Sequence, residues 1–201
     1  MSSFYTNIQL AGDTILYRGY ENGQPVQYRG SFSPTLYVLS KNKEKFKTLD
    51  GKYVSPVASF DEDDFVENFE VHGYERFVYQ YIREQFPTDV DYDINQMKVY
   101  ALDIEVQCEN GFPNVEEAAE EMLSITIKDM VTKKFYIWAV RDFETEHEHY
   151  VFDSEKDMLK SFLEWWVHHT PDILTGWNVN LYDVPYIARR LNRILGEKWM
   201  K

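Results

Sequence analysis

Residues 98–106, Lys-Val-Tyr-Ala-Leu-Asp-Ile-Glu-Val, form the segment that most limits how this chain can fold. The segment is rich in β-branched, aromatic and other apolar residues, which favour a strand. Because side chains alternate between the two faces of a strand, Leu102 and Ile104 are predicted to enter a core. Asp103 and Glu105 then share the opposite face. Two neighbouring carboxylates repel each other unless a cation lies between them, so the segment predicts a core strand that carries a metal-binding pair.

A third carboxylate, Asp183, follows 80 positions after Asp103, at the start of a helix predicted over residues 182–195. This helix comes after a short strand predicted over residues 172–176. A carboxylate at the beginning of such a helix can reach a strand-borne pair from the side. We therefore take Asp103, Glu105 and Asp183 as candidate ligands for divalent cations in phosphodiester hydrolysis.

The composition is that of a folded chain without disulfides. The 201 residues are 44% hydrophobic, which is enough for one large domain or two small ones. The single Cys108 excludes an intrachain disulfide and a multi-cysteine zinc site, and we interpret it as an incidental thiol in a reducing compartment. The sequence has no run of 18 apolar residues and no signal-peptide pattern, so we expect neither a membrane protein nor a secreted one.

The net charge of −13 argues against a chain that binds duplex DNA by itself. Both halves share the charge, with −6 on residues 1–97 and −7 on residues 98–201. A free-standing binder of duplex DNA usually presents a basic face. A carboxylate metal site needs no such face, because the cations supply the positive charge. The chain is therefore compatible with a part of a larger DNA enzyme.

Residues 1–97 are predicted to form a small, strand-rich α+β domain. Asn22-Gly23 is a strong hairpin signal. The four lysines between Lys41 and Lys47 favour a solvated turn over a contact with nucleic acid. The polar, turn-rich stretch 87–95 places the domain boundary near residue 97. The expected strands are 4–10, 14–20, 26–28 and 35–39, and a helix with an acidic first turn is expected over 59–69.

Residues 98–201 are predicted to form a mixed α/β sheet that helices cover. Ser154 and Asp157 match the pattern of a capping box at the start of a helix. His147 and His149 are interpreted as surface histidines rather than metal ligands. The elements expected after the first strand are an irregular stretch over 107–121, an antiparallel hairpin of 122–128 and 134–140, a helix ending at 168, the strand 172–176 and the helix 182–195.

The two motifs and their order resemble the proofreading 3′–5′ exonuclease domain of family B DNA polymerases. Their surroundings are most similar to the replicative polymerases of T-even-like bacteriophages. The family's first motif, Asp-x-Glu, is matched by Asp103 and Glu105. Its second motif, Asn-x-x-x-(Phe/Tyr)-Asp, is matched by Asn178, Tyr182 and Asp183. The resemblance implies a ribonuclease H-like fold for the second half and the family's N-terminal domain for the first.

The resemblance also implies a two-metal site for Mg²⁺ or Mn²⁺. Asp103 would bridge both ions, and Glu105 would bind the first ion and orient the attacking water. Asp183 would serve the second ion. Asn178, Phe112 and Tyr182 would contact the single-stranded primer end. Two alternatives stay open at this point, because Asn178 also fits a turn or cap and Phe112 also fits a core anchor.

By the resemblance, the family's third motif, Tyr-x-x-x-Asp, would lie well beyond Lys201, and the palm, fingers and thumb domains would lie further still. We therefore expect the N-terminal portion of a larger DNA-directed DNA polymerase, acting in the cytoplasm of a phage-infected bacterial cell. Because the third motif supplies a metal ligand and a water-orienting group, we expect little nuclease activity and no polymerase activity from this chain alone.

Two other functions are compatible with the sequence. The first is an RNA-binding regulatory module within residues 1–97, which would use aromatics and lysines such as Tyr37 and Lys41 to Lys47. The net charge of −6 on this segment counts against it. The second is a docking subunit of a split polymerase, which predicts a large exposed apolar patch near Leu191, Ile194 and Trp199.

Overall fold

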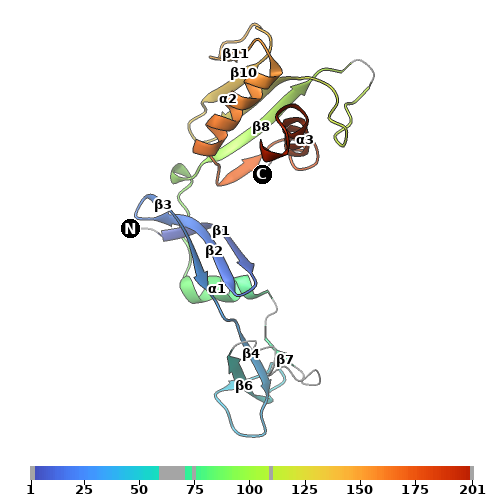
Figure 1. The fold of residues 1–201 in the computed structure, drawn as a ribbon. Helices are drawn as coiled ribbons and strands as arrows, with labels where there is room; N and C mark the ends of the chain where they lie inside the picture. The colour runs from blue at the N-terminus through green and yellow to red at the C-terminus, as the bar shows by residue number, and fades with distance from the viewer. Residues whose placement is uncertain (1–2, 59–70, 74–75, 109–110, 200–201) are drawn as a thin grey trace. The chain divides into compact units, whose positions relative to one another are not determined.

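The computed structural model describes residues 3–58, 71–73, 76–108 and 111–199. The chain divides into two compact units, residues 1–92 and 93–201, and the division falls inside the polar stretch 87–95 (Figure 1). The assignment of these units to two polymerase domains stays a prediction. In the described part of the chain, each helix is too short or too polar to cross a bilayer.

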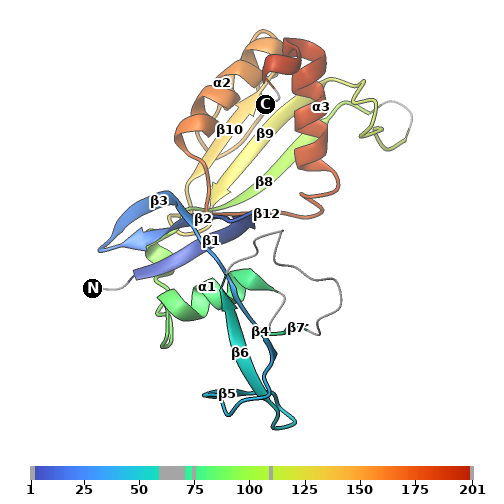
Figure 2. The same ribbon diagram turned by 60° about the horizontal axis from the view of Figure 1, so that its bottom comes forward.

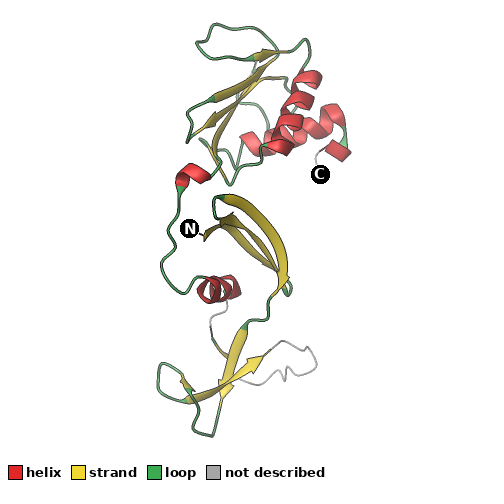
Figure 3. Cartoon of the chain, turned by 90° about the vertical axis from the view of Figure 1, so that its left-hand side faces the viewer, coloured by secondary structure: helices red, strands yellow, loops and turns green. Residues whose placement is uncertain are grey.

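The first unit contains two antiparallel sheets and a helix, which Figure 3 shows by colour. Asn22 and Gly23 both have positive φ, 53° and 79°, so the turn that the sequence predicted joins the second and third strands. A small core forms around Ile15, Tyr17, Phe32 and Tyr81. One sheet consists of β1 (Ser3–Ala11), β2 (Thr14–Glu21) and β3 (Gln24–Ser31), the other of β4 (Thr35–Leu39), β5 (Phe46–Lys47), β6 (Tyr53–Ala58) and β7 (Val71–His72), and the helix is α1 (Phe77–Gln85).

Four described elements of this unit, α1, β5, β6 and β7, were not predicted from the sequence. The predicted helix over 59–69 lies outside the described residues. Between Lys41 and Lys47 the chain bends and then enters β5, where the ammonium groups of Lys45 and Lys47 lie over the rings of Phe46 and Tyr53. These lysines thus have aromatic partners within the unit.

The second unit is a mixed sheet with two helices, as the sequence predicted, but its fifth strand, at residues 150–151, was not predicted. The strand order is β11-β10-β9-β8-β12, with β8, β9 and β10 antiparallel and β12 parallel to β8. Figure 2 shows both helices in front of the strands. The elements are β8 (Val99–Val106), β9 (Met122–Asp129), β10 (Phe135–Ala139), β11 (Tyr150–Val151), α2 (Glu155–His168), β12 (Ile173–Thr175) and α3 (Asp183–Leu195), with short 3-10 turns at Ile94–Gln96 and Glu197–Trp199.

Both helices of this unit bury their apolar faces against the sheet. At the start of α2, Ser154 Oγ accepts the backbone N–H of Asp157 and donates to its carboxylate, so the predicted cap is confirmed. The core gathers side chains from β8, β9, β10 and both helices, among them Leu102, Ile104, Ile125, Ile127, Trp138, Met158, Phe162, Tyr186 and Ile187.

The apolar patch that a docking subunit would present near Leu191 is not formed. Leu191 is only 5% exposed and belongs to the core, and Ile194 packs against the same core. Trp199, at 40% exposure, is the accessible member of the three. The feature that would have favoured a docking subunit is therefore not found at Leu191 and Ile194, because their side of α3 packs against the core.

Candidate functional site

The alternation predicted for β8 is present in the structure. Leu102 and Ile104 are 2% and 7% exposed and belong to the core. Asp103 and Glu105 lie between and beyond them on the exposed face. The strand therefore holds two carboxylates in water while its other face is fixed by packing.

Asp183 reaches the same strand through a backbone hydrogen bond. Its Oδ1 accepts the N–H of Ile104 at 3.2 Å, and its side chain is 2% exposed. The bond forms because β12 pairs only with residues 99–101 of β8. Beyond that point the N–H of Ile104 has no strand partner, and the carboxylate at the start of α3 takes the place of one.

The loop between β12 and α3 is built for close approach to β8. A Cβ atom at Gly176 would collide with the carbonyl oxygen of Leu102, so only glycine fits there. Asn178 has φ +61°, and its carbonyl accepts the N–H groups of Leu181 and Tyr182, both at 2.9 Å. Asn178 is thus a turn residue in this loop, with an exposed side chain. Its contact with DNA stays a prediction.

The pKa of Asp183 is raised above its ordinary value. The main cause is burial, which disfavours the charged form, and the negative charge of Asp103 adds to it. The hydrogen bonds from the backbone N–H groups of Asp183 and Ile104 oppose the shift. A cation next to Asp183 would favour the ionised form of its carboxyl.

Phe112 and Tyr182 contact each other at the start of α3. Their ring centroids are 4.7 Å apart, yet Phe112 is 78% exposed, so the alternative of a core anchor was wrong. The pKa of the Tyr182 phenol is raised, chiefly by burial and then by the charges of Asp183, Glu120 and, more weakly, Glu105. These charges place Tyr182 in the electrostatic neighbourhood of two candidate ligands.

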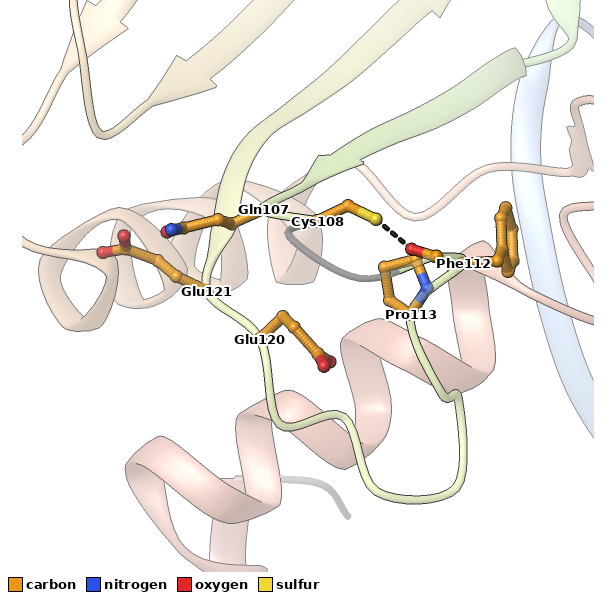
Figure 4. Close-up of a pocket in the computed structure, with 7 residues that line it drawn as sticks. Gln107, Cys108, Phe112, Pro113, Glu120 and Glu121 are labelled. Atoms are coloured by element: carbon orange, nitrogen blue, oxygen red, sulfur yellow. Dashed lines mark hydrogen bonds between the residues drawn. The ribbon is translucent and has the colours of Figure 1, made fainter.

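A hollow of about 340 Å³ lies beside these aromatic rings and is shown in Figure 4. Phe112 and Glu120 stand on its rim, and Cys108 Sγ donates to the carbonyl of Gly111. The irregular stretch predicted over 107–121 gave no sign that its two ends line a hollow. The remaining lining residues are Gln107, Pro113 and Glu121.

A buried ion pair was also missed. Arg190 and Glu155 are each 6% exposed, and the guanidinium binds both carboxylate oxygens, at 2.6 and 2.7 Å. Burial opposes the charge of Arg190, but Glu155 raises its pKa. The sequence held a signal for this pair, because Arg190 stands among Tyr186, Ile187 and Leu191 on the apolar face of α3, where a charge needs a partner.

The structure brings Asp183 to the backbone of β8 and into the field of Asp103. In the ranges that it describes, no group of three or more His, Cys, Asp or Glu side chains is arranged to hold one metal ion. The convergence of all three carboxylates stays a prediction. His147 stacks on Phe135 and His149 contacts Asp142 at 2.8 Å, and the His149 side chain, at 17% exposure, is more buried than the interpretation as a surface histidine implies.

The sequence is similar to parts of known DNA polymerases. The model of the exonuclease domain of DNA polymerase family B matches residues 53–201, more than half of the chain. The DNA-directed DNA polymerases of Enterobacteria phage T4 and Escherichia phage RB69 are 30% and 26% identical over 238 and 241 aligned residues. Each alignment covers 100% of this chain but 26% and 27% of those polymerases. The DNA polymerase catalytic subunit of human herpesvirus 8 is 28% identical over 48% of the chain.

Proposed function

The chain belongs to the family of exonuclease domains of family B DNA polymerases, and we propose that residues 93–201 hydrolyse phosphodiester bonds at the 3′ end of single-stranded DNA. The observation that supports this most directly is the bond between Asp183 and Ile104, at 3.2 Å. It ties the carboxylate of the second motif to the strand that carries the first. The mixed sheet with an antiparallel β8-β9-β10 core supports a ribonuclease H-like fold.

The side chains present fit Mg²⁺ or Mn²⁺ by their chemistry, since these hard cations prefer carboxylate oxygens. Asp103, Glu105 and Asp183 would hold the ions. Bound ions would lower the pKa of a water molecule and stabilise the leaving oxygen. Burial raises the pKa of Asp183, and a bound cation would favour its ionised form. The N–H of Ile104 holds one oxygen of that carboxylate in place.

The aromatic rings next to the carboxylates would bind the unpaired bases of the substrate. Phe112 offers an exposed face, and Tyr182 supports it from behind. Stacking on aromatic side chains tolerates any base, which suits an enzyme that trims mismatched ends. Asn178 would add a contact from its exposed side chain.

The chain spans about a quarter of the length of the two phage polymerases. We propose that it acts as part of a DNA-directed DNA polymerase, with the rest of that polymerase as its partner. Binding of RNA by residues 1–97 stays a prediction. Tyr37, a residue proposed for RNA binding, packs against Phe46, with ring centroids 5.2 Å apart.

The test is cleavage of a 5′-labelled single-stranded oligonucleotide by the full chain with Mn²⁺. We expect slow shortening from the 3′ end that Asp103→Ala abolishes and that Glu164→Gln, an exposed carboxylate change on α2, leaves unaltered. Equal rates in the Asp103 variant and the wild type would refute the assignment of the site. Robust cleavage that Asp103→Ala abolishes would show that the chain needs no third motif.

A further inference from the structure

One face of α3 joins the candidate site to the segment that forms the wall of the hollow. Tyr182, Tyr186 and Arg190 are spaced by four positions, so they follow one another along the helix. Tyr182 contacts Phe112 at the start of the segment. Tyr186 Oη donates to the carbonyl of Glu120 at 2.8 Å, near its end.

Arg190 makes the strongest of these contacts. Its Nη1 donates to the carbonyls of Ala118 and Ala119 at 3.0 and 2.8 Å, while Nε and Nη2 bind Glu155. Glu155 Oε1 in turn accepts the N–H of Met122 at 2.9 Å. One guanidinium therefore joins the first residue of α2, the middle of α3 and the backbone that leads into β9.

The segment that Arg190 holds has an unfavourable local conformation. Ala118 is fully buried and has φ +40°, a region that L residues with a side chain rarely adopt. Such a conformation persists only when surrounding contacts impose it. The two carbonyl bonds from Arg190 act on it here, together with the bond from Ala118 N–H to Asn114 O, the bond from Gln107 N–H to Glu121 O and the core packing of the Ala118 side chain.

A buried ion pair contributes little net stability compared with apolar side chains of similar volume, because both charges lose their hydration. The pair instead fixes the relative positions of its partners, since the planar guanidinium donates its hydrogen bonds within one plane. We propose that Arg190 is a positioning residue for the candidate site. It holds residues 111–121 against α3 so that Phe112 rests on Tyr182, next to Asp183. Its meaning for catalysis rests on the proposed function.

The decisive variant removes the hydrogen bonds of Arg190 without leaving an unpaired charge in the core. In Arg190→Met with Glu155→Gln, the amide oxygen of Gln still accepts the N–H of Met122, and no unpaired charge is left in the core. The matched control is Arg189→Met, one residue away, whose pair with Glu116 at 2.6 Å is exposed and therefore of small energetic weight.

Hydrogen exchange of the full chain tests the positioning claim without DNA or metal. We expect the amides of Gln107 and Ala118 to exchange about tenfold faster or more in the double variant, with β9 and β10 unchanged and Arg189→Met like the wild type. Unchanged protection of the segment, or an equal loss across the whole second unit, would overturn the claim.

Binding of fluorescent oligo(dT) in the presence of Ca²⁺ tests whether Arg190 acts through Phe112. Phe112→Ala and the double variant should each weaken the affinity about fivefold or more, and their combination should weaken it no further than the stronger of the two. Additive losses, or no loss in the double variant, would overturn action through Phe112. If the wild type does not bind oligo(dT), the proposed substrate is refuted, while the exchange result still decides the positioning claim.

Discussion

Asp183 Oδ1 accepts the backbone N–H of Ile104 at 3.2 Å, although the two residues are 79 positions apart. This bond closes the gap that β12 leaves when its pairing with β8 ends at Ala101. The carboxylate is thereby buried beside Asp103, which raises its pKa and makes it sensitive to pH and to cations.

The raised pKa of Asp183 predicts that the free energy of unfolding falls as the pH rises. In the unfolded chain this carboxyl titrates near 3.8, and in the folded chain it titrates higher. The stability that its proton supplies is fully present below 3.8 and is lost as the pH rises through the folded pKa. Wild type should therefore lose free energy of unfolding relative to Asp183→Asn over this range. Urea unfolding at a series of pH values measures the difference, and a constant difference would contradict the shift.

Bound cations should restore the stability that the folded chain loses when Asp183 ionises. A cation that binds only the folded chain stabilises it by about 1.4 kcal/mol when its concentration is ten times the Kd. We expect Mn²⁺ to raise the Tm of the wild type and of Glu164→Gln at pH 7, and to have a smaller effect on Asp103→Asn and Asp183→Asn. An equal rise in all four proteins would point to binding elsewhere on this acidic chain.

Local sequence patterns predicted most of the helices and strands of the second unit. The alternation in β8 and the cap at Ser154 depend on neighbours in sequence, and both appear in the structure. α1 gave no such signal, because its N-cap residue Arg76 makes no side-chain capping bond. Pro56 lies inside β6, and proline normally argues against a strand.

The candidate site was harder to predict than the fold. The motif residues were found because their types and spacing match a family. Arg190 and Glu155 are 35 positions apart, and the carbonyls that Arg190 binds are more than 70 positions away. No local pattern specifies such pairs, and only the charge at an apolar position of α3 hinted at one.

Gly176 should tolerate no side chain. Its φ is +159°, and an added Cβ would collide with the backbone of Leu102, which cannot move without disturbing β8. Gly176→Ala should lower the free energy of unfolding by about 1–3 kcal/mol or more. Gly30→Ala is the matched control, because a Cβ added at Gly30 would meet no neighbouring atom within 4 Å. This substitution should change the free energy of unfolding by less than about 1 kcal/mol. Similar unfolding curves for the two variants would show that the loop shifts freely.

Phe112 should matter for binding and hardly at all for folding. Because its side chain is 78% exposed, Phe112→Ala should change the free energy of unfolding by no more than about 0.5 kcal/mol. Loss of one base-stacking ring typically costs about 1–3 kcal/mol of affinity for single strands. Fluorescence anisotropy with oligo(dT) should therefore report a Kd about 5- to 150-fold higher. Phe143→Ala, at another exposed phenylalanine of the same unit, should leave the Kd unchanged. If both variants weaken binding alike, Phe112 has no special place beside the carboxylates, and a general loss of apolar surface explains the effect.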